Sequence, residues 1–143
     1  MKINPKTTNP MQAYIAISFS QRPFLSEALQ AITGALQHHN ILPFVFVDQY
    51  RFSQHQEKDM MQQAFANINA SDMLIAETSE KAIGTGVEVG YAKARNKTII
   101  YLRHQSTEHS TTVAGSSDFQ IIYQNAADLK QQLMIILKTL MIT

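Results

Sequence analysis

The chain has 143 residues, of which 45% are hydrophobic, so it is long enough to fold as one domain around a buried core. Its 12 basic residues balance 11 acidic ones, and the formal charge of +1 gives no electrostatic reason to expect a nucleic acid polymer or an anionic membrane as partner. The absence of cysteine excludes disulfides and thiolate nucleophiles, and a cytoplasmic protein that binds small molecules or proteins fits these limits best.

The first twelve residues are rich in Asn, Thr, Lys and Pro and have little to bury. We therefore predict a flexible leader over residues 1–12 and a single folded domain over residues 13–143. The leader lacks the apolar run of a signal peptide, and no stretch of the chain approaches the roughly 20 apolar residues that span a bilayer. We expect a soluble protein.

Short apolar runs and helical spacings of apolar residues alternate along the rest of the chain. In chain order they predict a strand over Ala13–Phe19, a helix with apolar residues from Phe24 to Leu36, a strand over Pro43–Asp48, a helix capped by Ser53, a strand over Asp72–Ala76, a helix over Val87–Arg95, strands over Thr98–Leu102 and Phe119–Tyr123, and a helix over Ala126–Leu140 capped by Asn125.

This alternation predicts an α/β fold with a five-stranded parallel sheet, and the strand order 2-1-3-4-5 of flavodoxin-like folds suits it. Ligands of such sheets bind beyond the carboxyl ends of the strands. Arg22 and Asp48 lie at such ends, and we expect Arg22 to contact an anionic ligand. The polar segment His104–Asp118 has no periodicity and is long for a connection, which favours a role in function or subunit contact.

The segment Gly84–Gly90 carries the sharpest signal in the sequence. Gly84 and Gly86 leave room for a ligand to approach the backbone at the start of the following helix. The spacing GxGxxxG and its position after the third strand differ from the dinucleotide-binding and P-loop motifs, which argues against both.

Glu88, within this segment, has two interpretations. Thr85 and Glu88 have the spacing of a capping box, in which each residue satisfies backbone donors of the other. Alternatively, the helix dipole holds Glu88 ionised in the first turn, where it can attack an electrophilic sugar carbon. A second carboxylate for the leaving group or for water would come from one of four acids, and spacing does not choose among Asp48, Asp59, Asp72 and Glu77. The histidines show no metal-ligand spacing, so we assign no metal.

The segments Ala70–Glu77 and Gly84–Ala92, together with Asp59, resemble the nucleoside 2-deoxyribosyltransferase family, which includes the related 2′-deoxynucleoside 5′-phosphate N-hydrolase. The resemblance implies that Glu88 is the nucleophile that attacks C1′, and that Asp59 contacts the sugar or assists proton transfer. Ala82 stands where the family has an Asp or Ser, so a neighbour such as Ser79 or Glu80 would have to take over the acid/base or phosphate-binding role.

Two further matches concern the ends of strands. Ser18 matches a family serine after the first strand, although the glycines that usually follow are replaced by Phe19–Arg22. Ser110 falls near the polar contact of a loop that reaches into a partner subunit's site, which implies a homodimer or a higher homo-oligomer. No cofactor is implied.

The sequence thus predicts an enzyme that cleaves the N-glycosidic bond of a nucleoside or nucleotide by transfer or hydrolysis. One alternative is a nucleotide-binding or sensing module that kept the fold and lost turnover, which Ala82 would permit. Another is an NAD hydrolase of TIR-like type, which also uses a single glutamate on an α/β sheet.

Overall fold

The computed structural model describes residues 10–141, and β1 (Met11–Ala16) begins within the segment predicted as a leader. Residues 1–9 of that leader lie outside the described residues. Met11 is buried and pairs with Ile41, while the backbone N–H of Gln12 donates to the Asp72 carboxylate at 2.9 Å. Strand β1 therefore starts two residues before the predicted boundary at Ala13. Its partners Ile41 and Asp72 are distant in the sequence, so no local pattern reveals this start.

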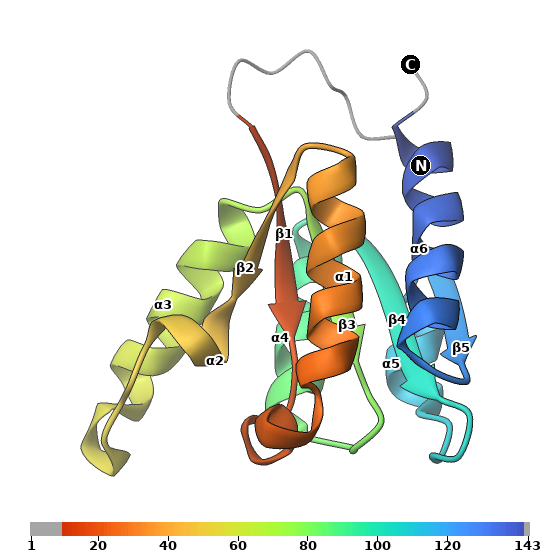
Figure 1. Ribbon diagram of the computed structural model, residues 1–143. Coiled ribbons are helices and arrows are strands. Elements are labelled where there is room, and N and C mark those ends of the chain that lie inside the picture. The colour runs from red at the N-terminus through yellow and green to blue at the C-terminus, as the bar shows by residue number, and fades with distance from the viewer. Residues whose placement is uncertain (1–9, 142–143) are drawn as a thin grey trace.

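The five strands form one parallel sheet in the order β2-β1-β3-β4-β5, which confirms the predicted flavodoxin-like fold (Figure 1). The other strands are β2 (Ile41–Val45), β3 (Met73–Glu77), β4 (Thr98–His104) and β5 (Phe119–Tyr123). Every residue of β3 is buried. A central strand that is covered on both faces has a continuous run of apolar residues, so β3 can be predicted from the sequence.

Helices cover both faces of the sheet (Figure 1). On one face α1 (Ser26–His38) and α6 (Ala126–Leu140) pack on alternate strand residues such as Ile15 and Ile75. On the other face α3 (Glu57–Asn69), α4 (Ile83–Ala94) and the short α5 (Thr111–Gly115) pack on the intervening residues, Tyr14 and Leu74 among them. The side-chain period of two in each strand thus divides the core into two layers.

Several predicted elements agree closely with the structure. The bounds of β5 and α6 are as predicted, and the side chain of Asn125 caps α6 by accepting the backbone N–H of Asp128 at 2.9 Å. Ser53 forms the capping box of a short 3-10 helix, η2 (Gln54–Gln56), which leads into α3. These ends were predictable because a cap and its partner are only three residues apart.

Two predicted strands end earlier than expected. The chain leaves β1 at Ala16 and then turns into a 3-10 helix, η1 (Phe19–Phe24), while β2 ends at Val45 and is followed by the short helix α2 (Phe46–Gln49). In both places the apolar run continues past the strand because Phe19 and Phe46 line a pocket instead of a strand face. Apolar composition cannot distinguish these two uses.

Small shifts occur elsewhere. β3 begins one residue after Asp72 and runs to Glu77, and β4 continues two residues beyond Leu102. The segment His104–Asp118, predicted to lack regular structure, contains α5, which is too short to show helical periodicity. No helix in the described part of the chain has the length and hydropathy of a membrane span.

Candidate active site

The segments that follow β1, β2 and β3 meet at one end of the sheet, where the strands' carboxyl ends lie (Figure 1). A pocket of about 210 Å³ opens there between η1, α2, α3 and α4. Its walls are mainly apolar, with Phe19, Phe46, Met60 and Met61 among them, and Glu88 is its only acid. This is the place where open parallel sheets bind ligands.

The segment Gly84–Gly90 lies inside α4, whose N-cap is Ala82 and which has no side-chain cap. Thr85 is therefore a buried helical residue and not a cap, so the capping-box interpretation is wrong. Helix α4 begins four residues before the predicted start at Val87, despite its glycines.

Those glycines are not required by backbone conformation, because no described glycine has a positive φ angle. A Cβ atom at Gly84, Gly86 or Gly90 would meet no atom within 4 Å apart from its chain neighbours and the nearby backbone of α4. Glycine inside a helix costs about 1 kcal/mol relative to alanine. Gly84 lines the pocket of Glu88 and Gly86 lines the adjoining pocket, so a ligand in either place can approach the backbone of α4 closely.

Glu88 sits in the second turn of α4 and receives a hydrogen bond from the hydroxyl of Tyr14 on β1. Burial raises the pKa of Glu88 to about 7, and the hydrogen bond from Tyr14 opposes that rise. Burial beside the same carboxylate raises the pKa of Tyr14 well above its ordinary value, so the phenol stays protonated. Glu88 thus lies one turn further into the helix than predicted, and burial raises its pKa instead of the helix dipole lowering it.

Tyr14 was missed by the sequence reasoning, which treated it as one more apolar residue of the first strand. The available signal was a hydroxyl in an otherwise apolar buried strand, because a buried tyrosine hydroxyl needs a partner. Met60 and Met61 were likewise not predicted as lining residues. Their position on the face of α3 that meets the pocket depends on how α3 packs on the sheet.

Asp59 lies in the first turn of α3, where it is exposed and does not line the pocket of Glu88. The α3 residues that line this pocket are Met60, Met61 and Ala64. The structure thus does not bring the two predicted catalytic carboxylates together.

Arg22 was predicted to contact an anionic ligand, but in the structure its guanidinium is paired with Asp48. Its guanidinium binds both carboxylate oxygens of Asp48, at 2.7 and 3.0 Å, and this pairing raises the pKa of Arg22. Neither residue lines the pocket of Glu88. The two predicted binding residues therefore hold η1 against α2.

The two predicted serines of this region have separate positions. Ser18 lines the pocket of Glu88 and donates a hydrogen bond from its hydroxyl to Glu80 at 2.8 Å. Ser79 instead joins a buried network in which its hydroxyl donates to Glu77 and accepts the backbone N–H of His104. Ser79 thus secures the loop after β3 and does not face Glu88.

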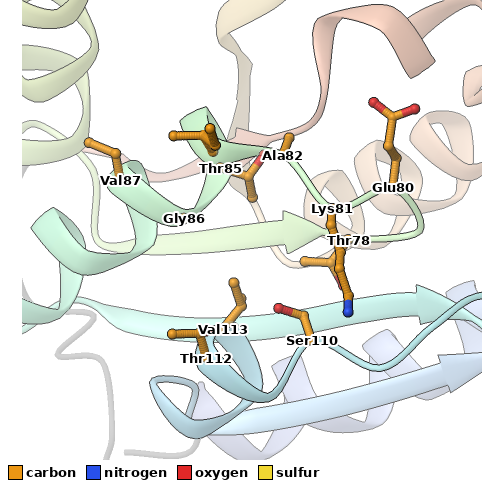
Figure 2. Close-up of a pocket in the computed structure, with 11 residues that line it drawn as sticks. Thr78, Glu80, Lys81, Ala82, Thr85, Gly86, Val87, Ser110, Thr112 and Val113 are labelled. Atoms are coloured by element: carbon orange, nitrogen blue, oxygen red, sulfur yellow. The ribbon is translucent and has the colours of Figure 1, made fainter.

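A second pocket of about 470 Å³ adjoins the first, with Ala82 and Thr85 lining both. Figure 2 shows Ser110 and Val113 facing Gly86 and the start of α4 across this pocket. The structure therefore places Gly86 and Ser110 at one opening and Ser18, Gly84 and Glu88 at the other. Between residues 10 and 141, no three His, Asp or Glu side chains converge to hold a metal ion.

Comparison with known proteins decides the family. The model of the family described as "Nucleoside 2-deoxyribosyltransferase" matches residues 13–134. The chain belongs to this family. Membership confirms the resemblance seen in the sequence, and the family consists of enzymes that act on the N-glycosidic bond of nucleosides or nucleotides.

Among curated proteins, the chain is similar to the "Putative 2'-deoxynucleoside 5'-phosphate N-hydrolase 1" of Syntrophotalea carbinolica. The two are 46% identical over 41 residues, and this match spans only 29% of each chain.

Solved structures of the same fold include the CMP N-glycosidase of Clostridium botulinum, with a TM-score of 0.62 and 20% identity over 87% of this chain and 98% of the other. A 2-deoxyribosyltransferase from Bacillus psychrosaccharolyticus has a TM-score of 0.63 and 15% identity over 85% and 95% of the two chains. A conserved protein from Enterococcus faecalis has a TM-score of 0.69 and 14% identity over 90% and 99%. At these identities the likeness is one of fold.

Proposed function

We propose that the protein cleaves the N-glycosidic bond of a nucleoside or nucleotide through nucleophilic attack by Glu88 on C1′. The observation that carries this proposal is the position of Glu88, an acid with a pKa near 7 in an apolar pocket beside bare glycines. Carboxylates of perturbed pKa in clefts are typical of functional sites. Family membership supplies the reaction class.

The proposed reaction has two steps. In the first, a Glu88 oxygen bonds to C1′, the C1′–N bond breaks, and its electrons pass to the departing base. In the second, water or another base attacks C1′ and releases Glu88 as a carboxylate. In hydrolysis, one water molecule supplies hydroxyl to the sugar and hydrogen to the base, so that the atoms balance.

Tyr14 and the aromatic wall have different parts in this proposal. Tyr14 orients one oxygen of Glu88 and leaves the other free to attack. Phe19 and Phe46 also line an adjoining pocket of about 290 Å³ that contains Tyr50 and Phe52, and these rings offer faces on which a nucleobase can stack. The geometry supports Glu88 as the reacting carboxylate better than Asp59, which is exposed outside the pocket.

A panel of deoxynucleosides, ribonucleosides and their 5′-phosphates tests the proposal, with base release followed by chromatography. A second free base added to the reaction separates transfer from hydrolysis, because transfer yields a new nucleoside. We expect base release from at least one member. Binding without turnover would instead support the sensing module, and release of nicotinamide from NAD would support the TIR-like alternative.

We also propose that the protein is a homodimer or a higher homo-oligomer whose interface includes the exposed side of α4. Ile83 and Val87 are one helical turn apart, are 89% and 45% exposed, and both line the pocket that contains Ser110. Large apolar side chains at the mouth of a pocket favour cover by another chain. In a homodimer of the kind that the family resemblance implies, a second copy of the chain would cover Ile83 and Val87.

Ile83→Glu should therefore weaken the oligomer by placing a charge in its interface. Size-exclusion chromatography with light scattering should show a smaller mass than for the wild type at the same concentration. Ile135→Glu is the matched control, since Ile135 is 64% exposed on α6 at the other face of the sheet and should leave the mass unchanged. A monomeric wild type would contradict the proposal.

A further inference from the structure

Three uncharged donors from the segment after β1 converge on one carboxylate from the segment after β3. The hydroxyls of Ser18 and Ser20 donate to one oxygen of Glu80 at 2.8 and 2.7 Å, and the side-chain amide of Gln21 donates to the other oxygen at 2.6 Å. We call these three residues the donor cradle. Converging hydroxyl and amide donors of this kind are suited to an anion, and here the protein supplies that anion itself.

Glu80 remains charged in this position. The hydrogen bonds from Ser20 and Ser18 lower the pKa of Glu80 below its ordinary value, and the one from Gln21 adds to them. At neutral pH the cradle therefore contains a fixed negative charge.

The cations of the same two segments are already paired. Arg22 binds Asp48 through two nitrogens, and Lys81 lies 3.1 Å from the carboxylate of Glu108. Figure 2 shows the Lys81 side chain extending toward Ser110, while Glu80 points the other way. Within residues 18–22 and 78–82, neither cation therefore pairs with Glu80, and the exposed Lys81 lines the larger pocket on the side away from that carboxylate.

The donor cradle borders the proposed reaction site. Ser18 lines the pocket of Glu88, Glu80 lines the adjoining pocket, and Ala82 and Thr85 belong to both. Because Ser18 and Glu88 line the same pocket, a nucleoside with C1′ against Glu88 can place its 5′ end beside this cradle. A 5′-phosphate placed there would meet the Glu80 carboxylate and find Ser18, Ser20 and Gln21 already engaged.

We propose that Glu80 is a specificity-determining residue, which occupies the donor cradle as a built-in anion and selects nucleosides with a free 5′-hydroxyl over nucleoside 5′-phosphates. Like charges brought together weaken binding, and an occupied donor adds nothing for a competing anion. The inference rests on the proposed function for the identity of its substrate, but the anion selectivity of the cradle can be measured without turnover.

The test compares wild type with Glu80→Gln, which removes the charge and keeps the side-chain size. For one base, kcat/KM is measured for the nucleoside and for its 5′-monophosphate, and binding of the same 5′-monophosphate is measured by calorimetry. We expect the wild type to prefer the nucleoside, and Glu80→Gln to shift the ratio toward the monophosphate by about fivefold or more, with a matching gain in binding. Glu57→Gln is the charge-matched control, because Glu57 is exposed in the first turn of α3.

Three results would overturn the inference: a wild-type preference for the monophosphate, a change below about twofold in Glu80→Gln, or an equal change in Glu57→Gln. If no compound of the panel is cleaved, the proposed function fails, and calorimetry still decides the inference. Tighter monophosphate binding by Glu80→Gln alone would support it, and unchanged binding would reject it.

Discussion

Glu88→Gln is expected to reduce base release by about a thousandfold or more, because an amide cannot form the glycosyl ester with C1′. Glutamine keeps the size of the side chain and can still accept the hydrogen bond from Tyr14. The quantity compared is the single-turnover rate constant of base release, measured with the nucleoside that the panel identifies. A variant that retains more than about a tenth of the wild-type rate would exclude Glu88 as the nucleophile.

The stability of this variant separates loss of chemistry from loss of fold. Burial raises the pKa of Glu88 from 4.5 to about 7, so the folded protein binds a proton that the unfolded chain has released over that pH range. The free energy of unfolding therefore falls as pH rises from about 4.5 to about 7, and the deficit above pH 7 is on the order of 3 kcal/mol.

Glutamine has no such deficit, since it cannot ionise. Glu88→Gln should thus melt at the same temperature as the wild type or higher at pH 8, with the gain disappearing near pH 4. An inactive variant of this kind has lost a functional carboxylate and not its fold. Calorimetric melting of both proteins at pH 8 and near pH 4 measures this difference. A lower melting temperature for Glu88→Gln than for the wild type at pH 8 would contradict the burial argument.

Tyr14→Phe is expected to move the acidic limb of the pH profile to higher pH. The nucleophile works as a carboxylate, so kcat/KM should rise with pH through the pKa of Glu88, near 7 in the wild type. The hydrogen bond from Tyr14 lowers that pKa, and removing it leaves burial unopposed. A net hydrogen bond to a charged group is worth about 1.5–3 kcal/mol, which predicts a displacement of about one pH unit or more and a loss of about tenfold at pH 7.

Most of that loss should be recovered at high pH, where Glu88 is ionised in both proteins. A merely structural role for Tyr14 would lower activity equally at every pH. Tyr91→Phe is the matched control, because the Tyr91 hydroxyl accepts a hydrogen bond from Asn69 at 2.7 Å and Tyr91 does not line the pocket of Glu88. A Tyr14→Phe profile with the wild-type midpoint would contradict the assigned role.

The candidate site was only partly predictable. Glu88 and the glycines around it were identified because they lie in one short segment with a recognisable spacing. Asp59 is also part of the resemblance, but its position depends on how α3 is turned against the sheet, and the structure leaves it in solvent. Arg22 and Asp48 were both predicted to meet a ligand, and the structure shows that they meet each other.

Sequence pattern was sufficient for the number of strands and their order, and it directed attention to the end of the sheet at which the candidate site lies. Those features follow from local periodicity and from the handedness of crossover connections, so they are encoded within short stretches of chain. The partners of the reacting groups are not encoded in this way. Tyr14 and Glu88 are 74 residues apart, and Ser18 and Glu80 are 62 apart. Only the packing of β1 beside β3 and α4 brings them together, and burial there raises the pKa of Glu88. Tertiary structure alone therefore decided which carboxylate lies in the apolar pocket and which one occupies the donor cradle.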